Sequence, residues 1–327
     1  MKVLVTGSAG HLGEALMHRL PEQDHEPRGL DINPSPFTHL VGSISDRQFV
    51  QEALTGMDAV IHCATLHKPH VATHSRQDFV DINITGTLNL LEEAVVAGVT
   101  SFVFTSTTSV FGDALRPPAG EPAAWITEDV RPLPKNIYGV TKVAAEDLCK
   151  LFQKHHGLNC IVLRTSRFFI EEDDDRSVRD HHTDANIKVN EFLHRRVDIE
   201  DAMSAHLLAL ERAAALGFDR FIISATTPFH SEDLIQLRHD LAGVVRRHCP
   251  QYESEYQRRG WSLFRTIDRV YVNTHARQRL GWEPRHDFGG IIERLRNDQD
   301  PMSPLARLIG SKGYHDRTFS DGPYPVA

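Results

Sequence analysis

The sequence predicts an α/β fold in which a doubly wound parallel sheet is followed by a smaller C-terminal domain. Short apolar runs alternate with stretches of helical periodicity through the first two thirds of the 327 residues, which favours right-handed βαβ units. A glycine-rich turn at Thr6–Gly13 joins the first apolar run to the first helical stretch. The length also exceeds that of one ordinary domain, at about 100–200 residues per domain.

The strands follow from the short apolar runs. Lys2–Thr6 is the first, and its continuous apolar character is typical of a strand buried on both faces. Further strands are expected at Arg28–Ile32, His39–Gly42, Ala59–Cys63, Ser101–Thr105, Cys160–Arg164 and Asp219–Ser224.

The helices follow from apolar residues at helical spacing. The first begins after the glycine turn, where Leu12, Ala15, Leu16 and Leu20 recur on one face. The others are expected at Asp46–Leu54, Asp78–Ala97, Tyr138–His156 and Ile199–Leu216. Gly98 and Gly157 end the two long helices, Asp78–Ala97 and Tyr138–His156.

Two stretches lack such periodicity. Residues 116–136 are rich in proline and predict an irregular surface loop. Residues 171–190 are polar, begin with five consecutive acids and predict a mobile loop or lid. We therefore assign residues 1–168 and about 197–227 to the sheet domain. The substrate-binding lid, domain and tail would comprise about residues 169–196 and 228–327. The end, from residue 301, is expected to be disordered or to pack on a neighbour.

Composition excludes several classes of function. The 36 basic and 44 acidic residues give a net charge of −8, which offers no electrostatic footprint for nucleic acid or an anionic membrane. No apolar run reaches the roughly 18 residues of a membrane span. The four cysteines form no CxxC pair, and the chain enters a strand at once without a signal peptide. We therefore expect reduced thiols and a cytoplasmic location.

A metal site is not expected. His181, His182 and Asp184 lie in the polar stretch beside the acidic run. Adjacent histidines in such a loop rarely bind one ion without a third fixed ligand. A solvated loop is the simpler interpretation.

The glycine turn is the first motif that indicates chemistry. Gly7 permits a sharp turn, Gly10 lets the backbone approach a pyrophosphate, and Gly13 lets the helix pack close to the sheet. The N-terminus of the helix offers free N–H groups to phosphates. This arrangement predicts a Rossmann-type dinucleotide site, with a purely structural turn as the alternative.

Asp31 selects between the two nicotinamide cofactors. It lies at the end of the second predicted strand, 18 residues after Gly13. A carboxylate there accepts both ribose hydroxyls of adenosine and repels a 2′-phosphate. The next residue, Ile32, adds no positive charge. NAD is therefore favoured over NADP.

A second motif stands at the start of the second long helix. Tyr138 and Lys142 lie four apart and therefore share one helical face. A tyrosine that acts as a base near neutral pH needs its pKa lowered from about 10, which a nearby ammonium and a positive nicotinamide ring favour. A solvent-exposed surface pair is the alternative. The strand Ser101–Thr105 runs into a hydroxyl cluster at 105–109, at the sheet edge where parallel sheets bind ligands.

Together these motifs resemble an extended short-chain dehydrogenase/reductase of the NAD-dependent epimerase/dehydratase family, the group of UDP-glucose 4-epimerase. The resemblance extends over almost the whole chain. The matching segments are Thr6–Gly13, Asp31, Asn83 within Asp81–Thr87, Phe102–Gly112, Thr127–Asp129, Tyr138–Lys142, Glu146, His275–Arg277 and Leu280–Pro284.

The resemblance implies roles for these residues. Tyr138 would be the general acid/base, Lys142 would bind the nicotinamide ribose and lower the tyrosine pKa, and Thr107 would complete the catalytic triad. Asn83 would hold the helix and a water near the site. The implied cofactor-binding set is Gly7, Gly10, His11, Leu12, Gly13, Asp31, Ile32, Ser43, Ile44, Cys63, Ala64, Thr65, Asn83, Thr105, Ser106, Tyr138 and Lys142. Family members usually form a homodimer, here through helices 78–97 and 138–156.

The sequence departs from the nucleotide-sugar enzymes after the strand at Cys160–Arg164. Arg167 stands where those enzymes carry an asparagine, and five acids follow at 171–175. The acids would oppose a diphosphate unless Arg176, Arg179, Arg195 and Arg196 offset them. Thr108 and Arg167 are the expected substrate contacts.

Three functions stay open on the sequence. The first is hydride transfer at a hydroxyl or carbonyl carbon of a sugar or sugar nucleotide by an epimerase or dehydratase. The second is a net NAD-dependent dehydrogenase or reductase of a free sugar, sugar acid or small alcohol. The third is a non-catalytic NAD-binding sensor, against which the complete set of Thr107, Tyr138 and Lys142 argues. Thr108-Ser109 in place of an Asp-Glu pair weakens the dehydratase option.

Overall fold

A seven-stranded parallel sheet forms the centre of the molecule in the computed structural model, which describes all residues except 314, 316–318, 320–321 and 325–327. The strands lie in the order β3-β2-β1-β4-β5-β7-β8, so the chain moves outward from β1 and then returns to β4 on its other side. This is the predicted doubly wound fold. The strands are β1 (Lys2–Thr6), β2 (Glu26–Asp31), β3 (Leu40–Val41), β4 (Ala59–His62), β5 (Ser101–Thr107), β7 (Asn159–Thr165) and β8 (Phe218–Ile223).

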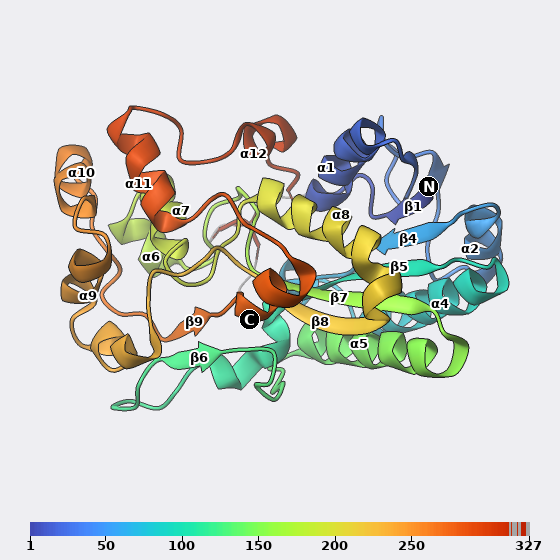
Figure 1. The fold of residues 1–327 in the computed structure, drawn as a ribbon, viewed down its shortest axis with the longest axis horizontal. Helices are drawn as coiled ribbons and strands as arrows, with labels where there is room; N and C mark the ends of the chain where they lie inside the picture. Colours follow the sequence, from blue (N-terminus) through green and yellow to red (C-terminus); the bar gives the residue numbers. More distant parts are fainter. Residues whose placement is uncertain (314, 316–318, 320–321, 325–327) are drawn as a thin grey trace.

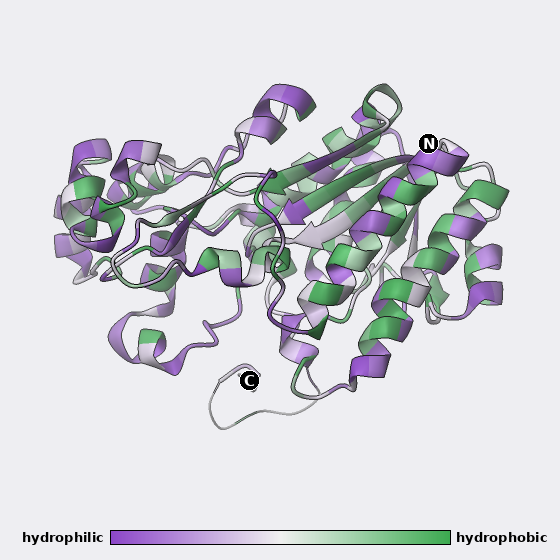
Figure 2. Cartoon of the chain, turned by 90° about the horizontal axis from the view of Figure 1, so that it is seen from below, coloured by the Kyte–Doolittle hydropathy of each residue, from purple (hydrophilic) through white to green (hydrophobic). Residues whose placement is uncertain are grey.

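Helices cover both faces of the sheet (Figure 1). One face carries α1 (His11–Arg19) and α8 (Ile199–Leu216), and the other carries α2 (Arg47–Leu54), α4 (Gly86–Val96) and α5 (Ile137–His156). Successive strand residues point to opposite faces, so Leu4 packs in the core under α2, α4 and α5, while Val3 and Val5 pack in the core under α1 and α8. Figure 2 shows the covering helices banded green and purple along their length, as expected of helices with one buried face.

The helix predicted at Asp78–Ala97 is interrupted. It begins earlier, because Ser75 and Asp78 cap the short helix α3 (Arg76–Phe79) reciprocally. A π-helical segment, η3 (Val80–Thr85), then precedes α4. Such segments are frequent at functional sites, and η3 carries Asn83 inward, with 2% of its surface exposed.

The C-terminal lobe packs beside the ends of the strands (Figure 1). A two-stranded parallel sheet joins β6 (Ala124–Ile126) to β9 (Arg269–Tyr271). The prediction of an irregular loop over 116–136 was therefore wrong for β6, where Ile126 is buried and pairs with Tyr271. The lobe's helices are α9 (Leu241–His248), α10 (Tyr252–Arg259), α11 (Phe288–Arg296) and α12 (Pro304–Ile309). The proposed domain boundaries stay a prediction.

The polar stretch 171–190 is largely helical. It contains α6 (Arg176–His181) and α7 (Asp184–Glu191), which are capped by Asp175 and Thr183. Six residues of α7 are buried, including Ile187 and Glu191. The expectation of a loop was therefore wrong for α7, whose Lys188 and Glu191 side chains are buried and paired.

Four observations bear on the remaining sequence predictions. Within the described residues, every helix is too short or too polar to cross a membrane. All four cysteines are free thiols, and three are buried. Of the histidines considered for metal binding, His181 contacts the carbonyl of Ser177 and His182 contacts Asn186. The tail prediction from residue 301 falls partly outside the described residues, although α12 packs against α1 and α8.

Candidate active site

The glycine turn lies between β1 and α1. Gly7 adopts a left-handed conformation with φ of +76°, and its N–H donates to the carbonyl of Leu30 at 2.7 Å. A Cβ atom added to Gly13 would lie 2.0 Å from the carbonyl oxygen of Gly7. The turn and the first turn of α1 are therefore packed backbone to backbone, as a dinucleotide cradle requires. The residues present fit a bound dinucleotide.

Asp31 lies at the end of β2 beside this turn. Its carboxylate accepts hydrogen bonds from the backbone N–H groups of Ala9, at 3.0 Å, and Asn33, at 2.9 Å. The side chain is thereby held at the carboxyl edge of the sheet, where the sequence predicts a ribose contact. Ile32 is exposed beside it. Ser43 and Ile44 follow β3, and Ile44 is buried in the core under α2, α4 and α5.

The segment after β4 is tied to α5 by Asn83. The Asn83 carboxamide oxygen accepts from the Thr65 hydroxyl and the Leu66 N–H, both at 2.9 Å. Its amide nitrogen donates to the Leu66 carbonyl at 2.8 Å and to the Thr141 hydroxyl at 3.1 Å. Asn83 therefore fixes the post-β4 segment, Cys63–Leu66, against the first turn of α5.

Thr107 and Tyr138 meet at the end of β5. The Thr107 oxygen accepts from the Ser109 N–H at 3.1 Å, and its hydroxyl lies close enough to the Tyr138 phenol to influence the pKa of that phenol. Asn136 caps α5 by accepting from the Gly139 N–H at 3.1 Å, which places Tyr138 in the first turn. Burial raises the pKa of Tyr138 to about 12, although the neighbouring Thr107 hydroxyl acts to lower it.

Lys142 lies one turn further along α5 and reaches the same strand. Its ammonium donates to the Thr105 carbonyl at 2.6 Å and lies 4.0 Å from the centre of the Phe104 ring. Burial lowers its pKa to about 8, although nearby Glu146 raises it. The structure thus brings Thr107, Tyr138 and Lys142 to one edge of β5.

The side-chain hydroxyls of Thr105 and Ser106 contact different residues. The Thr105 hydroxyl lies 3.2 Å from the Cys63 sulfur and 2.9 Å from His206 Nε2. Because His206 Nδ1 faces the Ala202 carbonyl at 2.7 Å, its Nε2 is the acceptor for Thr105. The Ser106 hydroxyl donates to Glu146 at 2.5 Å. Any cofactor contact of Ser106 would therefore come from its backbone.

Sequence reasoning missed an ion pair behind the triad. Glu146 on α5 accepts from Arg164 on β7 at 2.7 Å, and both side chains are at most 2% exposed. This pair joins α5 to β7. The sequence feature that could have indicated this ion pair is the position of Glu146, four residues after Lys142 on the same helical face.

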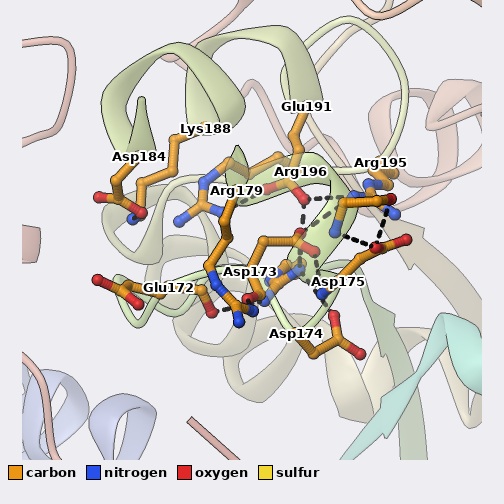
Figure 3. Close-up of polar contacts among 12 residues, drawn as sticks. Glu172, Asp173, Asp174, Asp175, Arg179, Asp184, Lys188, Glu191, Arg195 and Arg196 are labelled. Atoms are coloured by element: carbon orange, nitrogen blue, oxygen red, sulfur yellow. Dashed lines mark hydrogen bonds and ion pairs between the residues drawn. The ribbon is translucent and has the colours of Figure 1, made fainter. Parts of the chain in front are cut away.

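Arg167, predicted as a substrate contact, is held by carboxylates. Its guanidinium lies 2.7 Å from Asp173 and 3.4 Å from Glu191. Arg195 and Arg196 also pair with Glu191, at 2.8 and 2.7 Å (Figure 3). Thr108, the other predicted substrate contact, is buried directly after β5.

Asp173 and Asp174 of the acidic run pair with basic side chains, but only in part with the arginines that the sequence indicated. Asp173 pairs with Arg195, whereas Asp174 pairs with Lys68 from the post-β4 region. Glu171 lies 2.7 Å from His11 Nε2. The remaining candidates, Arg176 and Arg179, bind Asp180 and the backbone carbonyl of Asp173.

A pH-dependent contribution to stability is expected from Glu171. Burial acts to raise its pKa, but hydrogen bonds from His11 and the Lys312 N–H outweigh it and hold the pKa at about 2. A lowered folded-state pKa stabilises the fold above the unfolded value of 4.5, and this stability is lost as the pH falls from about 4.5 to 2. The expected loss is about 3 kcal/mol.

Urea unfolding at several pH values checks this, with Glu171→Gln as the comparison. The wild type should lose about 3 kcal/mol more than the variant across that range. Equal losses would contradict the assigned contacts of Glu171.

Comparisons with known proteins identify the family of the chain. The model of the NAD dependent epimerase/dehydratase family matches residues 3–223. UDP-glucose 4-epimerase of Rhizobium meliloti is 26% identical over 332 residues, covering 90% of this chain and 96% of that protein. L-arabinose 1-dehydrogenase of Haloferax volcanii is 31% identical over 179 residues, covering 50% of this chain and 65% of that protein. An uncharacterized protein of Sinorhizobium fredii is 36% identical over 167 residues, 49% of this chain, and the match spans 39% of its length.

Solved structures share the fold. A short-chain dehydrogenase/reductase superfamily protein from Agrobacterium tumefaciens, with bound NAD, superposes with a TM-score of 0.65 at 24% identity, covering 94% of this chain and 97% of that one. UDP-glucose 4-epimerase of Thermotoga maritima, with UDP-glucose, gives a TM-score of 0.61 at 21% identity, covering 91% and 99%. At these identities the likeness establishes the fold alone.

Proposed function

Because the chain belongs to the NAD-dependent epimerase/dehydratase family, we propose that it transfers a hydride at a hydroxyl-bearing or carbonyl carbon of a sugar or sugar nucleotide. The observation that carries the proposal is that Thr107, Tyr138 and Lys142 lie together at the end of β5, with the Lys142 ammonium held by the Thr105 carbonyl at 2.6 Å. NAD, the cofactor that the glycine turn and Asp31 predict, supplies the hydride acceptor and a positively charged ring when bound.

The residues of the chain carry the proton chemistry. Tyr138 takes the proton of the substrate hydroxyl during oxidation and returns it during reduction. Thr107 donates a hydrogen bond to the substrate oxygen, which stabilises the charge that develops there. Burial raises the Tyr138 pKa to about 12 despite the lowering effect of Thr107, so a phenolate requires positive charge beside the ring. The Lys142 ammonium, held by the Thr105 carbonyl, is one source of that charge.

Net oxidation of a free sugar, sugar acid or small alcohol is the alternative, and the charge around Arg167 favours it. A diphosphate substrate needs cations that are not already neutralised. Arg167, Arg195 and Arg196 all pair with Asp173 or Glu191. The relative from Haloferax volcanii is named as a dehydrogenase of L-arabinose, a sugar that carries no nucleotide. A non-catalytic NAD sensor would need no Thr107–Tyr138 pair.

Identification of the nucleotide that the purified protein carries separates the two enzymatic readings. The protein is denatured and the released nucleotide is analysed by chromatography. Near-stoichiometric NAD(H) is expected of an enzyme that returns the hydride to its product. An empty protein that binds added NAD reversibly supports the dehydrogenase instead, and an empty protein that binds no NAD contradicts both.

We also propose a homodimer through α4 and α5, in a reduced cytoplasmic setting. Val96, Val140 and Leu151 on these helices are 72%, 47% and 47% exposed. Apolar residues on helices that already cover the sheet favour a further helical partner. Sedimentation velocity should give twice the chain mass, and Leu151→Glu should shift it toward the monomer. A wild-type monomer at micromolar concentration would contradict the dimer.

A further inference from the structure

Two neighbouring strands of the central sheet end in polar side chains that meet in the core. Thr6 ends β1 and His62 ends β4, and the two are direct partners in the parallel register. Leu4 and Val60, two residues earlier on each strand, pack in the core under α2, α4 and α5. Alternate strand residues share a face, so Thr6 and His62 point into that same core. The Thr6 hydroxyl oxygen lies 2.7 Å from His62 Nδ1, and both residues are at most 1% exposed.

The other ring nitrogen of His62 reaches α4. His62 Nε2 lies 3.0 Å from the Thr87 hydroxyl oxygen, and the Thr87 hydroxyl donates to the Asn83 carbonyl at 2.7 Å. Because the one hydroxyl hydrogen of Thr87 is used there, His62 Nε2 carries a hydrogen and donates it to Thr87. His62 Nδ1 is then the acceptor for the Thr6 hydroxyl. Burial, together with a smaller effect of the Lys142 ammonium, lowers the pKa of His62 well below 6.5, so the ring is neutral as this assignment requires.

The two ends of this chain of hydrogen bonds reach the same stretch of backbone. The Thr6 hydroxyl oxygen also accepts from the Ala64 N–H at 3.2 Å. At the other end, the Asn83 carboxamide holds Thr65 and Leu66. The hydrogen bonds therefore close a ring around the post-β4 segment, and His62 joins the two halves of that ring.

This ring of hydrogen bonds borders the glycine turn. Thr6 directly precedes Gly7, and a Cβ atom added to Gly7 would lie 2.7 Å from the backbone nitrogen of Ala64. The loops after β1 and β4 are therefore packed backbone to backbone at the sheet edge where a dinucleotide binds. The hydrogen bond from Ala64 to Thr6 joins the two loops, and His62 orients the hydroxyl that accepts it. A buried polar network whose members are all paired makes its segments rigid.

We propose that His62 is a positioning residue for the cofactor, which holds the post-β4 segment against the glycine turn through Thr6 and Thr87. This inference rests on the binding of NAD at that turn, which the proposed function requires. At 1% exposure the His62 ring is closed off from a bound ligand, so it acts only through the two hydroxyls that it orders.

Thr87 tests this role from outside the predicted cofactor contacts, because it lies on α4 and is 0% exposed. Thr87→Val keeps the shape of the side chain and removes the hydroxyl, whereas Thr87→Ser keeps the hydroxyl and loses a methyl group. NADH affinity of the full-length protein, measured by fluorescence titration, should fall about tenfold in Thr87→Val and stay near that of the wild type in Thr87→Ser. A role in packing alone predicts the reverse order, because valine fills the space that serine leaves empty. Wild-type affinity in Thr87→Val would overturn the proposal.

His62→Phe tests the ring itself, because it keeps an aromatic ring and removes both nitrogens. Its NADH affinity should fall by a similar factor, and adding Thr87→Val to it should cause no further loss, since the chain is already broken. Full additivity of the two losses would overturn the proposal. The matched control is Val60→Ala, on the same strand and the same face and 0% exposed. It should lower the stability without changing NADH affinity, and weaker binding in this control would show that affinity follows stability alone.

The tautomer of His62 gives a readout that does not depend on the cofactor. NMR of isotopically labelled histidine nitrogens should show one neutral ring protonated at Nε2, with a signal that is lost in His62→Phe. Protonation at Nδ1 instead would contradict the direction of the hydrogen-bond chain and overturn the proposal. A wild type that shows the expected tautomer but binds no NADH would overturn the cofactor assignment, and the positioning role with it, while leaving the ring of hydrogen bonds in place.

Discussion

Tyr138→Phe should lower turnover by about 10² to 10⁴, the usual contribution of a general acid/base, while NAD affinity stays near that of the wild type. The change removes one oxygen from a side chain that is 8% exposed. The ring still fills its place, so the fold and the neighbouring Lys142 contact with Thr105 are retained. What is lost is the only step that needs the phenol, which is transfer of the substrate proton.

The matched control for this prediction is Tyr252→Phe. Tyr252 lies on α10 in the C-terminal lobe, and its hydroxyl makes a long 3.5 Å contact to the Ala242 carbonyl. Its removal should leave turnover unchanged. Steady-state rates and NADH titrations of the three proteins give the comparison. Wild-type turnover in Tyr138→Phe would exclude this residue as the acid/base.

Gly13→Ala should abolish dinucleotide binding and destabilise the protein by about 1–3 kcal/mol, the cost of overpacking a closed contact. Its Cβ would lie 2.0 Å from the Gly7 carbonyl oxygen and 2.8 Å from the Ser8 Cα. Both obstacles are backbone, so a side-chain rotation cannot relieve the overlap. The turn and α1 must separate, and the N–H groups at the start of α1 then lose their alignment.

Gly98→Ala separates this effect from ordinary glycine strain. Gly98 has a φ of +75°, and a Cβ there would meet nothing within 4 Å. Its substitution should cost about 1 kcal/mol and leave NADH binding intact. Thermal unfolding and NADH titration of both variants provide the measurement. Normal NADH affinity in Gly13→Ala would contradict the close-packed cradle.

The sheet could be predicted because its signals are local. β1 is a buried strand whose five residues suffice to identify it, and α8 has the predicted bounds Ile199–Leu216. The glycine turn and the Tyr138–Lys142 spacing are likewise short motifs whose chemistry follows from residue type. These elements need no knowledge of distant contacts.

The parts that sequence reasoning missed depend on partners far along the chain. α7 is polar in sequence, but Glu191 is buried among three arginines: Arg195 and Arg196 are near in sequence, whereas Arg167, at 3.4 Å, stands 24 residues earlier. β6 forms only against β9, more than 140 residues later. The contact of Glu171 with Gly313 spans a similar separation. The spacing of apolar residues and the local composition carry no information about such long-range pairings.

The most direct test of the central claim is hydride transfer itself. The wild type and Tyr138→Phe, each loaded with NAD, are mixed rapidly with a panel of sugar nucleotides, free sugars and sugar acids, and the absorbance of reduced nicotinamide is followed. We predict reduced nicotinamide in the wild type with at least one of these substrates, transient for an epimerase and lasting for a dehydrogenase, and its loss in Tyr138→Phe. A wild type that binds NAD but reduces none of it across the panel would contradict the enzymatic account and favour a binding role.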